Sequence, residues 1–319
     1  MLAALAAALL AATAPQAAPA PASPQAAQAP TPTPQTPDES PVRLEDVQVT
    51  GRTLDTLIHG FVNEVAAPNR RRGIARWQDQ ICIGAANLRT EVAQYLVDRV
   101  STVAEDMGLK PGEPGCAANV LIIASDDPDG LARQLIDERS RAFRMGGTGM
   151  DRGAAALRAF ASSDRPVRWW QLSMPTDVQT GDRAVRLPGD ESAPVINVFA
   201  ASRLSTQIVD NLFRTIVILD VDQVSQVSAV QLADYVAMVT LAQIDPAADT
   251  RAYASILNVF EESDAIEGLT DWDLAYLKGL YDAERNSQNL RAGRSEIASS
   301  IRRAHDAADE AADDTDEAE

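Results

Sequence analysis

The stretch QLADYVAMVTLAQIDP, residues 231–246, decides the fold prediction for this 319-residue chain. Its spacing predicts a helix over residues 230–244 with apolar side chains on nearly every face. The main polar exceptions are Gln231, Asp234, Thr240 and Gln243. A helix that is apolar all round is packed on most of its sides, whereas a surface helix keeps one polar face. We therefore predict a central, buried helix that ends at an Asp-Pro pair.

The residues before this helix alternate between strand and helix patterns. Short apolar runs predict strands at 47–51, 80–85, 119–125, 166–174, 194–199 and 214–221. Apolar residues at helical spacing predict helices at 55–66, 88–108, 126–143 and 205–213. After Asp222 the pattern is helical throughout. This order predicts an α/β, or α+β, domain over residues 42–303, with a mixed sheet, packed helices and a helical C-terminal half.

The two ends of the chain differ in composition from this domain. Residues 1–22 form an apolar, Ala-rich run of the kind that a signal peptidase removes, and residues 23–41 form a Pro/Ala-rich linker. Residues 304–319 hold eight carboxylates and no Lys or Arg, which predicts an acidic disordered tail. We expect a periplasmic or secreted protein of a Gram-negative bacterium, with no transmembrane span in the mature chain.

The formal net charge is -18, and removing the eight carboxylates of the tail leaves about -10 for the remaining residues. Such a charge disfavours phosphate backbones, so nucleic acid is excluded as a partner. The two cysteines, Cys82 and Cys116, have no nearby His and the wrong spacing for a metal site. In an oxidising compartment they form a structural disulfide between two sheet elements.

Side chains for catalysis are scarce. The histidines are His59, predicted in an early helix as a partly buried structural residue, and His305 in the acidic tail, and there is no GxSxG motif. Asp220 and Asp222 follow a predicted strand, where carboxylates face a cleft or cap the next helix. RMGGTGMDRG, at 144–153, lacks the Gly-Lys-Ser/Thr of a P-loop and is predicted as a surface loop over a groove.

Two phrases follow the central helix. SILNVF occupies residues 255–260, and LTDWDLAYLKGLY occupies residues 269–281. In the second phrase Thr270 and Asp273 form a capping box, with Leu269 and Leu274 at the staple positions. This start places Leu274, Leu277 and Tyr281 along one buried face of the helix that follows.

The order of these phrases resembles the second half of a zincin or metzincin type of zinc metallopeptidase domain. In that family a helix carries HExxHxxGxxH or HExxHxxGxxD, a Met-containing turn such as SIMN follows, and a phrase like LTxxDxxxLxxLY closes the domain. Here LAQID at 241–245 stands where LGxxH or LGxxD would, and SILN stands at the turn, with Leu257 in place of Met. The first half, with ARWQDQICIG, a long helix and CAANVLIIAS, is also similar in order. The chain is similar to metallopeptidase-like envelope proteins of unknown function in Gram-negative bacteria, and the resemblance implies a zincin-like fold.

On this register the zinc site is degenerate. Tyr235 and Val239 occupy the two helical His positions, Val236 the position of the catalytic Glu, and Ala242 that of the Gly, while Asp245 alone matches a ligand. Two imidazoles at i and i+4 hold the zinc, and the Glu takes a proton from the metal-bound water. Val has no group for either task, so the resemblance implies no catalytic residue, no bound metal and no cofactor.

Two functions of different classes follow. The first is a non-catalytic pseudo-peptidase that binds a peptide or an envelope protein in the former substrate cleft, with Trp169 and Trp170 as groove-lining anchors. The second is a hydrolase with a carboxylate-based metal site made from Asp220, Asp222, Asp234 and Asp245. Sites built only from carboxylates prefer Mg or Ca, which favours the first function over the second. A purely structural envelope role stays open.

Overall fold

The computed structural model describes residues 53–69, 72–146, 149–196, 205–285 and 290–316. The predicted signal peptide, the linker and the predicted strand at 47–51 lie outside these residues. The main sheet has four strands in the order β2 (Ile83–Ala86), β4 (Val120–Ser125), β6 (Ile208–Asp220) and β5 (Val167–Asp177). Strands β2, β4 and β6 are parallel, and β5 pairs antiparallel to β6 at the edge. A short parallel pair joins β1 (Gln80–Ile81) to β3 (Lys110–Pro111).

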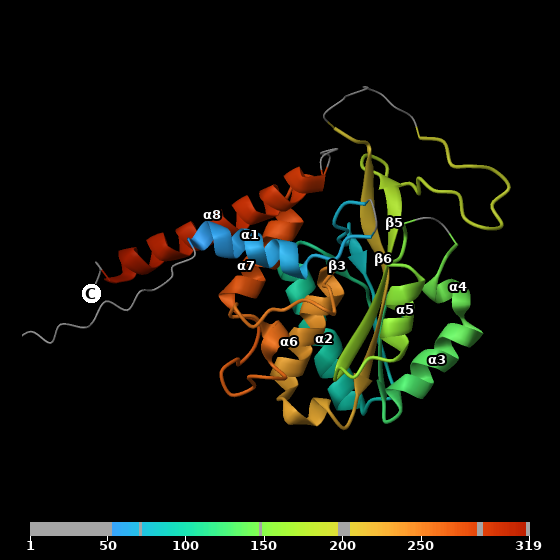
Figure 1. The fold of residues 1–319 in the computed structure, drawn as a ribbon, viewed down its shortest axis with the longest axis horizontal. Helices are drawn as coiled ribbons and strands as arrows, with labels where there is room; N and C mark the ends of the chain where they lie inside the picture. The colour runs from blue at the N-terminus through green and yellow to red at the C-terminus, as the bar shows by residue number, and fades with distance from the viewer. Residues whose placement is uncertain (1–52, 70–71, 147–148, 197–204, 286–289, 317–319) are drawn as a thin grey trace, which may run out of the picture. The chain divides into compact units, whose positions relative to one another are not determined.

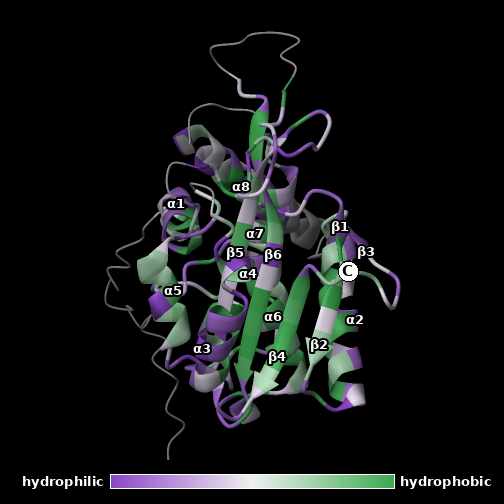
Figure 2. Ribbon diagram, turned by 90° about the vertical axis from the view of Figure 1, so that its right-hand side faces the viewer, coloured by the Kyte–Doolittle hydropathy of each residue, from purple (hydrophilic) through white to green (hydrophobic). Residues whose placement is uncertain are grey.

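Helices cover both faces of this sheet (Figure 1). Helices α2 (Thr90–Asp106) and α6 (Ala229–Leu241) lie on one face, and α3 (Pro128–Glu138), α4 (Ser140–Phe143) and α5 (Ala154–Ala161) lie on the other. Because successive side chains of a strand point to opposite faces, β5 contributes to two cores. Trp169 packs in the cluster with α6, whereas Trp170 and Leu172 pack in the cluster with α3, α4 and α5. Figure 2 shows β4 and the adjoining part of β6 as hydrophobic, as strands buried on both faces require.

Helix α6 is the central helix that the sequence predicts. Every residue from 231 to 241 is buried, including the polar side chains of Gln231, Asp234 and Thr240. Its start is fixed by a capping box in which the Ser228 hydroxyl accepts from the Gln231 amide and the Gln231 side chain accepts from the Ser228 amide. Gln231 also donates to the carbonyls of Ser263 and Ile266, so the cap ties α6 to the chain that follows it.

The remaining helices are α1 (Leu54–Val65), α7 (Asp271–Asp282) and α8 (Leu290–Asp316), with the short 3-10 helices η1 (Val224–Gln226) and η2 (Ile256–Asn258). Of these helices, α7 contacts α6, and α8 packs against α7 and α1. Leu277 is fully buried as expected, but Leu274 is 36% exposed, because it lies on the outward side of α7. Helix α8 continues to Asp316, through most of the stretch 304–319 that the sequence predicts as a disordered tail. Within the described ranges no helix combines the length and the apolarity that a membrane crossing requires.

Several predicted elements differ from the observed ones. Residues 208–213, predicted as part of a helix, are the first half of β6, because they pair with the end of β5 over Ser173–Asp177. The predicted helix at 126–143 is divided at Arg139 into α3 and α4. Pro194, Val195 and Ile196, at the start of a predicted strand, have no regular structure. Helix α5 was not predicted. Residues 208–213 form a strand because they pair with a distant segment, and local propensity does not predict such pairing.

Cys82 and Cys116 form the predicted disulfide, with their Cα atoms 6.1 Å apart. Cys82 lies between β1 and β2, and Cys116 lies four residues before β4. The amide of Asn119 and the amide of Val120 both donate to the Cys82 carbonyl, so hydrogen bonds hold the same two segments together. The bridge therefore closes the loop that contains α2 without distorting the sheet around it.

Removing the disulfide is expected to lower stability by about 3 to 4 kcal/mol, because the bridge closes a loop with a sequence separation of 34. Urea unfolding is measured for the oxidised wild-type protein and for the Cys82→Ser/Cys116→Ser variant. A second comparison uses the wild-type protein after a reductant has opened the disulfide. Equal unfolding free energies for the oxidised protein and the double variant would contradict this expectation.

Candidate functional site

The helical positions that the resemblance assigns to a zinc site are filled by the protein core. Tyr235 is 3% exposed, and Val236 and Val239 are fully buried. The Tyr235 ring makes edge contacts with Trp169 of β5, at 6.2 Å between ring centroids, and with Phe260, at 5.1 Å. An aromatic cluster therefore occupies the space beside α6 that faces the edge strand.

The hydroxyl of Tyr235 stays protonated at physiological pH. Burial raises the pKa of this phenol to about 12, and the nearby Arg165 guanidinium only partly offsets that effect. A neutral phenol is a weak metal ligand, because metal binding requires the deprotonated group. The chemistry at this position is that of a buried hydrogen-bonding group.

The two phrases after α6 are joined by one carboxylate. Asp273 is fully buried, and it accepts hydrogen bonds from the Ser255 hydroxyl at 2.6 Å and from the Ile256 amide at 2.7 Å. The same carboxylate accepts from the Thr270 amide, and the Thr270 hydroxyl accepts from the Asp273 amide, which completes the predicted capping box. Burial raises the pKa of Asp273, while these donors favour its ionised form. The SILN turn and the start of α7 are therefore one structural unit.

Asp273→Ala is expected to lower the free energy of unfolding by about 3 kcal/mol, because it leaves several buried donors without an acceptor. Asp271→Ala is the matched control: this residue is an exposed acid in the same helical turn, and its removal should cost about 1 kcal/mol or less. Urea titration of both variants measures the difference. Similar losses in the two variants would show that the carboxylate does not join the two phrases.

The structure does not gather the four aspartates of the alternative metal site. Asp220 accepts from the amides of Asp222 and Gln223 in the turn after β6. Asp234 forms a two-bond ion pair with Arg99 and accepts from the Leu269 amide. No group of three or more His, Cys, Asp or Glu that could hold a metal ion occurs in the described part of the chain. The carboxylates of Asp220, Asp234 and Asp245 each have a separate partner instead.

The two histidines lie on different helices, His59 on α1 and His305 on α8. His59 is exposed on α1, so the prediction of a partly buried histidine there is wrong: the apolar face of α1 is formed by Ile58, Phe61, Val62 and Val65. The His305 ring packs 5.3 Å from the Trp272 ring. Neither residue belongs to a catalytic constellation of described residues.

A cavity of about 310 Å³ lies along the outer edge of β5. One wall is α5, with Ala156, Ala159 and Phe160, and the opposite wall is the chain that leaves α6, residues 243–247. Residues 168–171 of β5 form the floor. Trp169 and Trp170 both line it, as the sequence predicts, although they are only 4% and 3% exposed and project from opposite faces of the sheet. We call this cavity the edge groove.

The backbone of β5 points hydrogen-bonding groups toward the edge groove. The Asp220 amide donates to the Pro166 carbonyl at 2.9 Å, which makes 166 and 220 a hydrogen-bonded pair of the antiparallel ladder. Hydrogen-bonded and non-hydrogen-bonded pairs alternate in such a ladder. Trp169 and Gln171, which pair with Val217 and Thr215, are therefore in non-hydrogen-bonded pairs. Their N–H and C=O groups point away from β6, toward the free edge.

Farther along β5, other segments of the chain already form hydrogen bonds with this edge. The Ser173 amide donates to the Met150 carbonyl at 2.9 Å. Met150 is fully buried, so this part of the segment 144–153, predicted as a surface loop over a groove, packs against the strand. The Ala184 amide donates to the Pro175 carbonyl beyond it. The open part of the edge is thus the stretch that the edge groove follows.

Side chains from three distant segments hold the C-terminal end of α6. The last carbonyls of a helix have no partner within the helix. The Gln171 side chain donates to the carbonyls of Val239 and Ala242, at 2.9 and 2.7 Å. The Trp77 indole donates to the Thr240 carbonyl, and the Tyr281 hydroxyl donates to the Leu241 carbonyl. These bonds fix the helix end against β5 and so fix the position of one groove wall.

Gln171→Met is expected to lower the free energy of unfolding by about 2 kcal/mol, because two buried carbonyls lose their donor while the side-chain volume is nearly kept. Gln134→Met is the matched control, since the Gln134 amide donates to Glu138 on the exposed side of α3 and should contribute about 0.5 kcal/mol or less. Chemical denaturation of both variants provides the comparison. A cost for Gln171→Met no greater than that of the control would contradict the role of Gln171 at the helix end.

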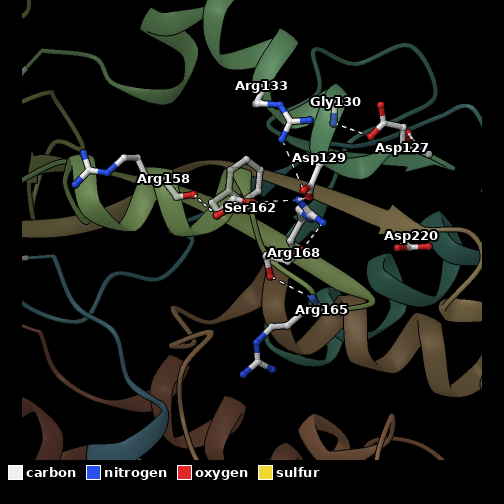
Figure 3. A network of polar contacts seen from close by, with 12 residues as sticks. Asp127, Asp129, Gly130, Arg133, Arg158, Ser162, Arg165, Arg168 and Asp220 are labelled. Carbon is white, nitrogen blue, oxygen red and sulfur yellow. Dashed lines mark hydrogen bonds and ion pairs between the residues drawn. The ribbon is translucent and has the colours of Figure 1, made fainter.

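The charged residues that line the edge groove are three arginines and one aspartate. Arg152 forms an ion pair with Asp245 at 2.8 Å, which joins the loop before α5 to the chain after α6. Arg168, 3% exposed, forms an ion pair with Asp129 at 2.6 Å. Figure 3 shows the Arg165 guanidinium pointing away from that second pair. Asp245, the one ligand match of the degenerate zinc site, is thus engaged with Arg152.

Sequence reasoning did not single out Arg152, Arg165, Arg168 or Gln171. The alternation in RPVRWWQ, residues 165–171, is a signal that could have pointed to some of them. It places Trp169 and Gln171 on one face of a strand and Arg168 and Trp170 on the other. No protein-family model, curated protein or solved structure matches this chain. The geometry of the edge groove is therefore the basis for a functional proposal.

Proposed function

We propose that this protein is an exported, non-catalytic protein of zincin-like architecture that binds an extended peptide in the edge groove. The observation that carries the proposal is the groove itself, which runs along a strand edge where the backbone groups of Trp169 and Gln171 point away from β6. An extended peptide adds to such an edge as a further strand, and its alternate side chains enter the neighbouring pocket. The peptide is a free one or part of another envelope protein.

The filled helical positions support a binding role rather than a catalytic one. Tyr235, Val236 and Val239 stand in the register of the resemblance where two zinc ligands and a general base would be, and all three are buried in the core. A peptidase needs a metal-bound water or an equivalent nucleophile near the scissile carbonyl. In this proposal the former catalytic helix serves as the scaffold that positions the groove.

The disulfide supports the proposed location. Structural disulfides persist in oxidising compartments such as the periplasm or the extracellular space, and they are rare in the cytosol. The Cys82–Cys116 bridge fits the expectation, drawn from residues 1–22, that the protein is exported. The second function, hydrolysis at a carboxylate-held metal, gains no support, because three of its four carboxylates, those of Asp220, Asp234 and Asp245, have separate partners.

A peptide-binding experiment tests the proposal. Immobilised protein is incubated with a pool of N-acetylated octapeptides of mixed sequence, and the bound fraction is identified by mass spectrometry. We expect enrichment of peptides rich in β-branched and aromatic residues, recovered uncleaved even after addition of Zn²⁺. Ala159→Trp should abolish the enrichment, because Ala159 lines the groove and the larger ring fills it.

Ala155→Trp is the matched control for this variant. It makes the same change on the same helix, at an exposed residue outside the groove lining, and should bind as the wild type does. No enrichment by the wild-type protein, or equal enrichment by the Ala159→Trp variant, would refute peptide binding in the groove. Cleaved products from the wild-type protein would refute the non-catalytic role.

A further inference from the structure

The edge groove contains a guanidinium without an acidic partner. Of its three arginines, Arg152 is paired with Asp245 and Arg168 with Asp129. Arg165 forms no ion pair with any carboxylate in the described ranges; its neighbour is the Tyr235 hydroxyl, which is neutral. Most of the arginines that line this groove are therefore neutralised, and Arg165 is not.

An unsatisfied donor also lies in the groove lining. The Nε atom of Arg168 is buried and has no hydrogen-bond partner among the described residues, although the terminal nitrogens of this side chain are engaged with Asp129 and the carbonyls of Phe160 and Ser163. A buried N–H donor without an acceptor costs free energy, so it marks a place where an acceptor stabilises the protein. One donor of the Arg168 side chain thus stays unpaired in the groove lining, on the face of β5 that carries Trp170.

The position of Arg165 relative to β5 determines which end of a bound peptide lies near its side chain. Arg165 precedes the first residue of β5, Val167, by two positions, so it stands beyond the end of the strand edge. A peptide that pairs with Trp169 and Gln171 in the antiparallel sense runs with its C-terminal end toward Val167 and Arg165. At about 3.4 Å per residue, the peptide residue opposite Val167 is about 7 Å past the one opposite Trp169.

We propose that Arg165 forms a carboxylate subsite at this end of the edge groove, which selects peptides that carry a C-terminal carboxylate or an acidic side chain there. This inference rests on the proposed function and names the ligand chemistry of the same site. A guanidinium matches a carboxylate with two parallel hydrogen bonds, and a neutral peptide end leaves it unpaired. Both kinds of peptide present a carboxylate to Arg165. The experiment distinguishes a C-terminal carboxylate from an acidic side chain.

The experiment compares four octapeptide pools that are identical at their random positions. One pool has a free C-terminal carboxylate, one has a C-terminal amide, and two amidated pools carry Asp or Asn at the penultimate position. We expect the wild-type protein to bind at least one carboxylate pool about tenfold more tightly than its neutral counterpart, as measured by fluorescence anisotropy. The pool that shows the preference identifies the source of the carboxylate.

Arg165→Gln should remove this preference and leave the affinity for the amidated Asn pool within about twofold. Arg165→Lys should retain part of it, because the charge is kept and the two-bond geometry is lost. Arg158→Gln is the matched control, since it removes the same charge from an exposed position of α5 outside the groove lining and should keep the full preference. Figure 3 shows both arginines.

The outcomes separate this inference from the proposed function. Binding of all four pools with equal affinity, blocked by Ala159→Trp, would overturn the carboxylate subsite and leave peptide binding in place. A carboxylate preference that survives in the Arg165→Gln variant, or that is lost equally in Arg158→Gln, would also overturn the subsite. Failure of every pool to bind the wild-type protein would overturn both.

Discussion

The end of helix α6 is the constraint on which the candidate site depends. This helix is buried on all sides, so its last carbonyls have no access to water and need donors from the protein. Gln171, Trp77 and Tyr281 supply those donors from β5, from the segment before β1 and from α7. Each unsatisfied carbonyl would cost about 1 to 3 kcal/mol, comparable to a sizeable fraction of the stability of a domain. The three segments are therefore held at one point.

This anchoring produces the edge groove. After α6 the chain continues through residues 243–247 beside β5, where the Trp169 indole donates to the Ile244 carbonyl and the Arg152–Asp245 ion pair joins it to the loop before α5. Among the residues that the structure describes, β5 is the edge of the sheet, so the backbone groups of Trp169 and Gln171 that point away from β6 have no neighbouring strand. The groove forms because α5 and residues 243–247 flank this edge without covering all of it.

The electrostatics of the groove oppose those of the whole protein. The chain carries a formal charge of -18, which repels an acidic peptide at long range. At physiological ionic strength this repulsion is screened beyond about 8 Å, whereas a contact with Arg165 lies well within that distance. The carboxylate preference should therefore appear in the dissociation rate more than in the association rate. Local geometry, and not net charge, sets the ligand chemistry here.

The sequence by itself determined the buried helix, the strand-and-helix order of residues 55–143, the disulfide and the Thr270–Asp273 cap. These features rest on periodicity, on cysteine count and on contacts within a few residues, which a single chain displays directly. Only the tertiary structure decided that residues 208–213 lie in a strand, that β5 is an edge in the described part of the chain, that Gln171 caps α6, and that Arg165 lies beside the Tyr235 hydroxyl. Those facts depend on segments that are distant along the chain, and which charges and carbonyls find partners is fixed only when the segments pack together.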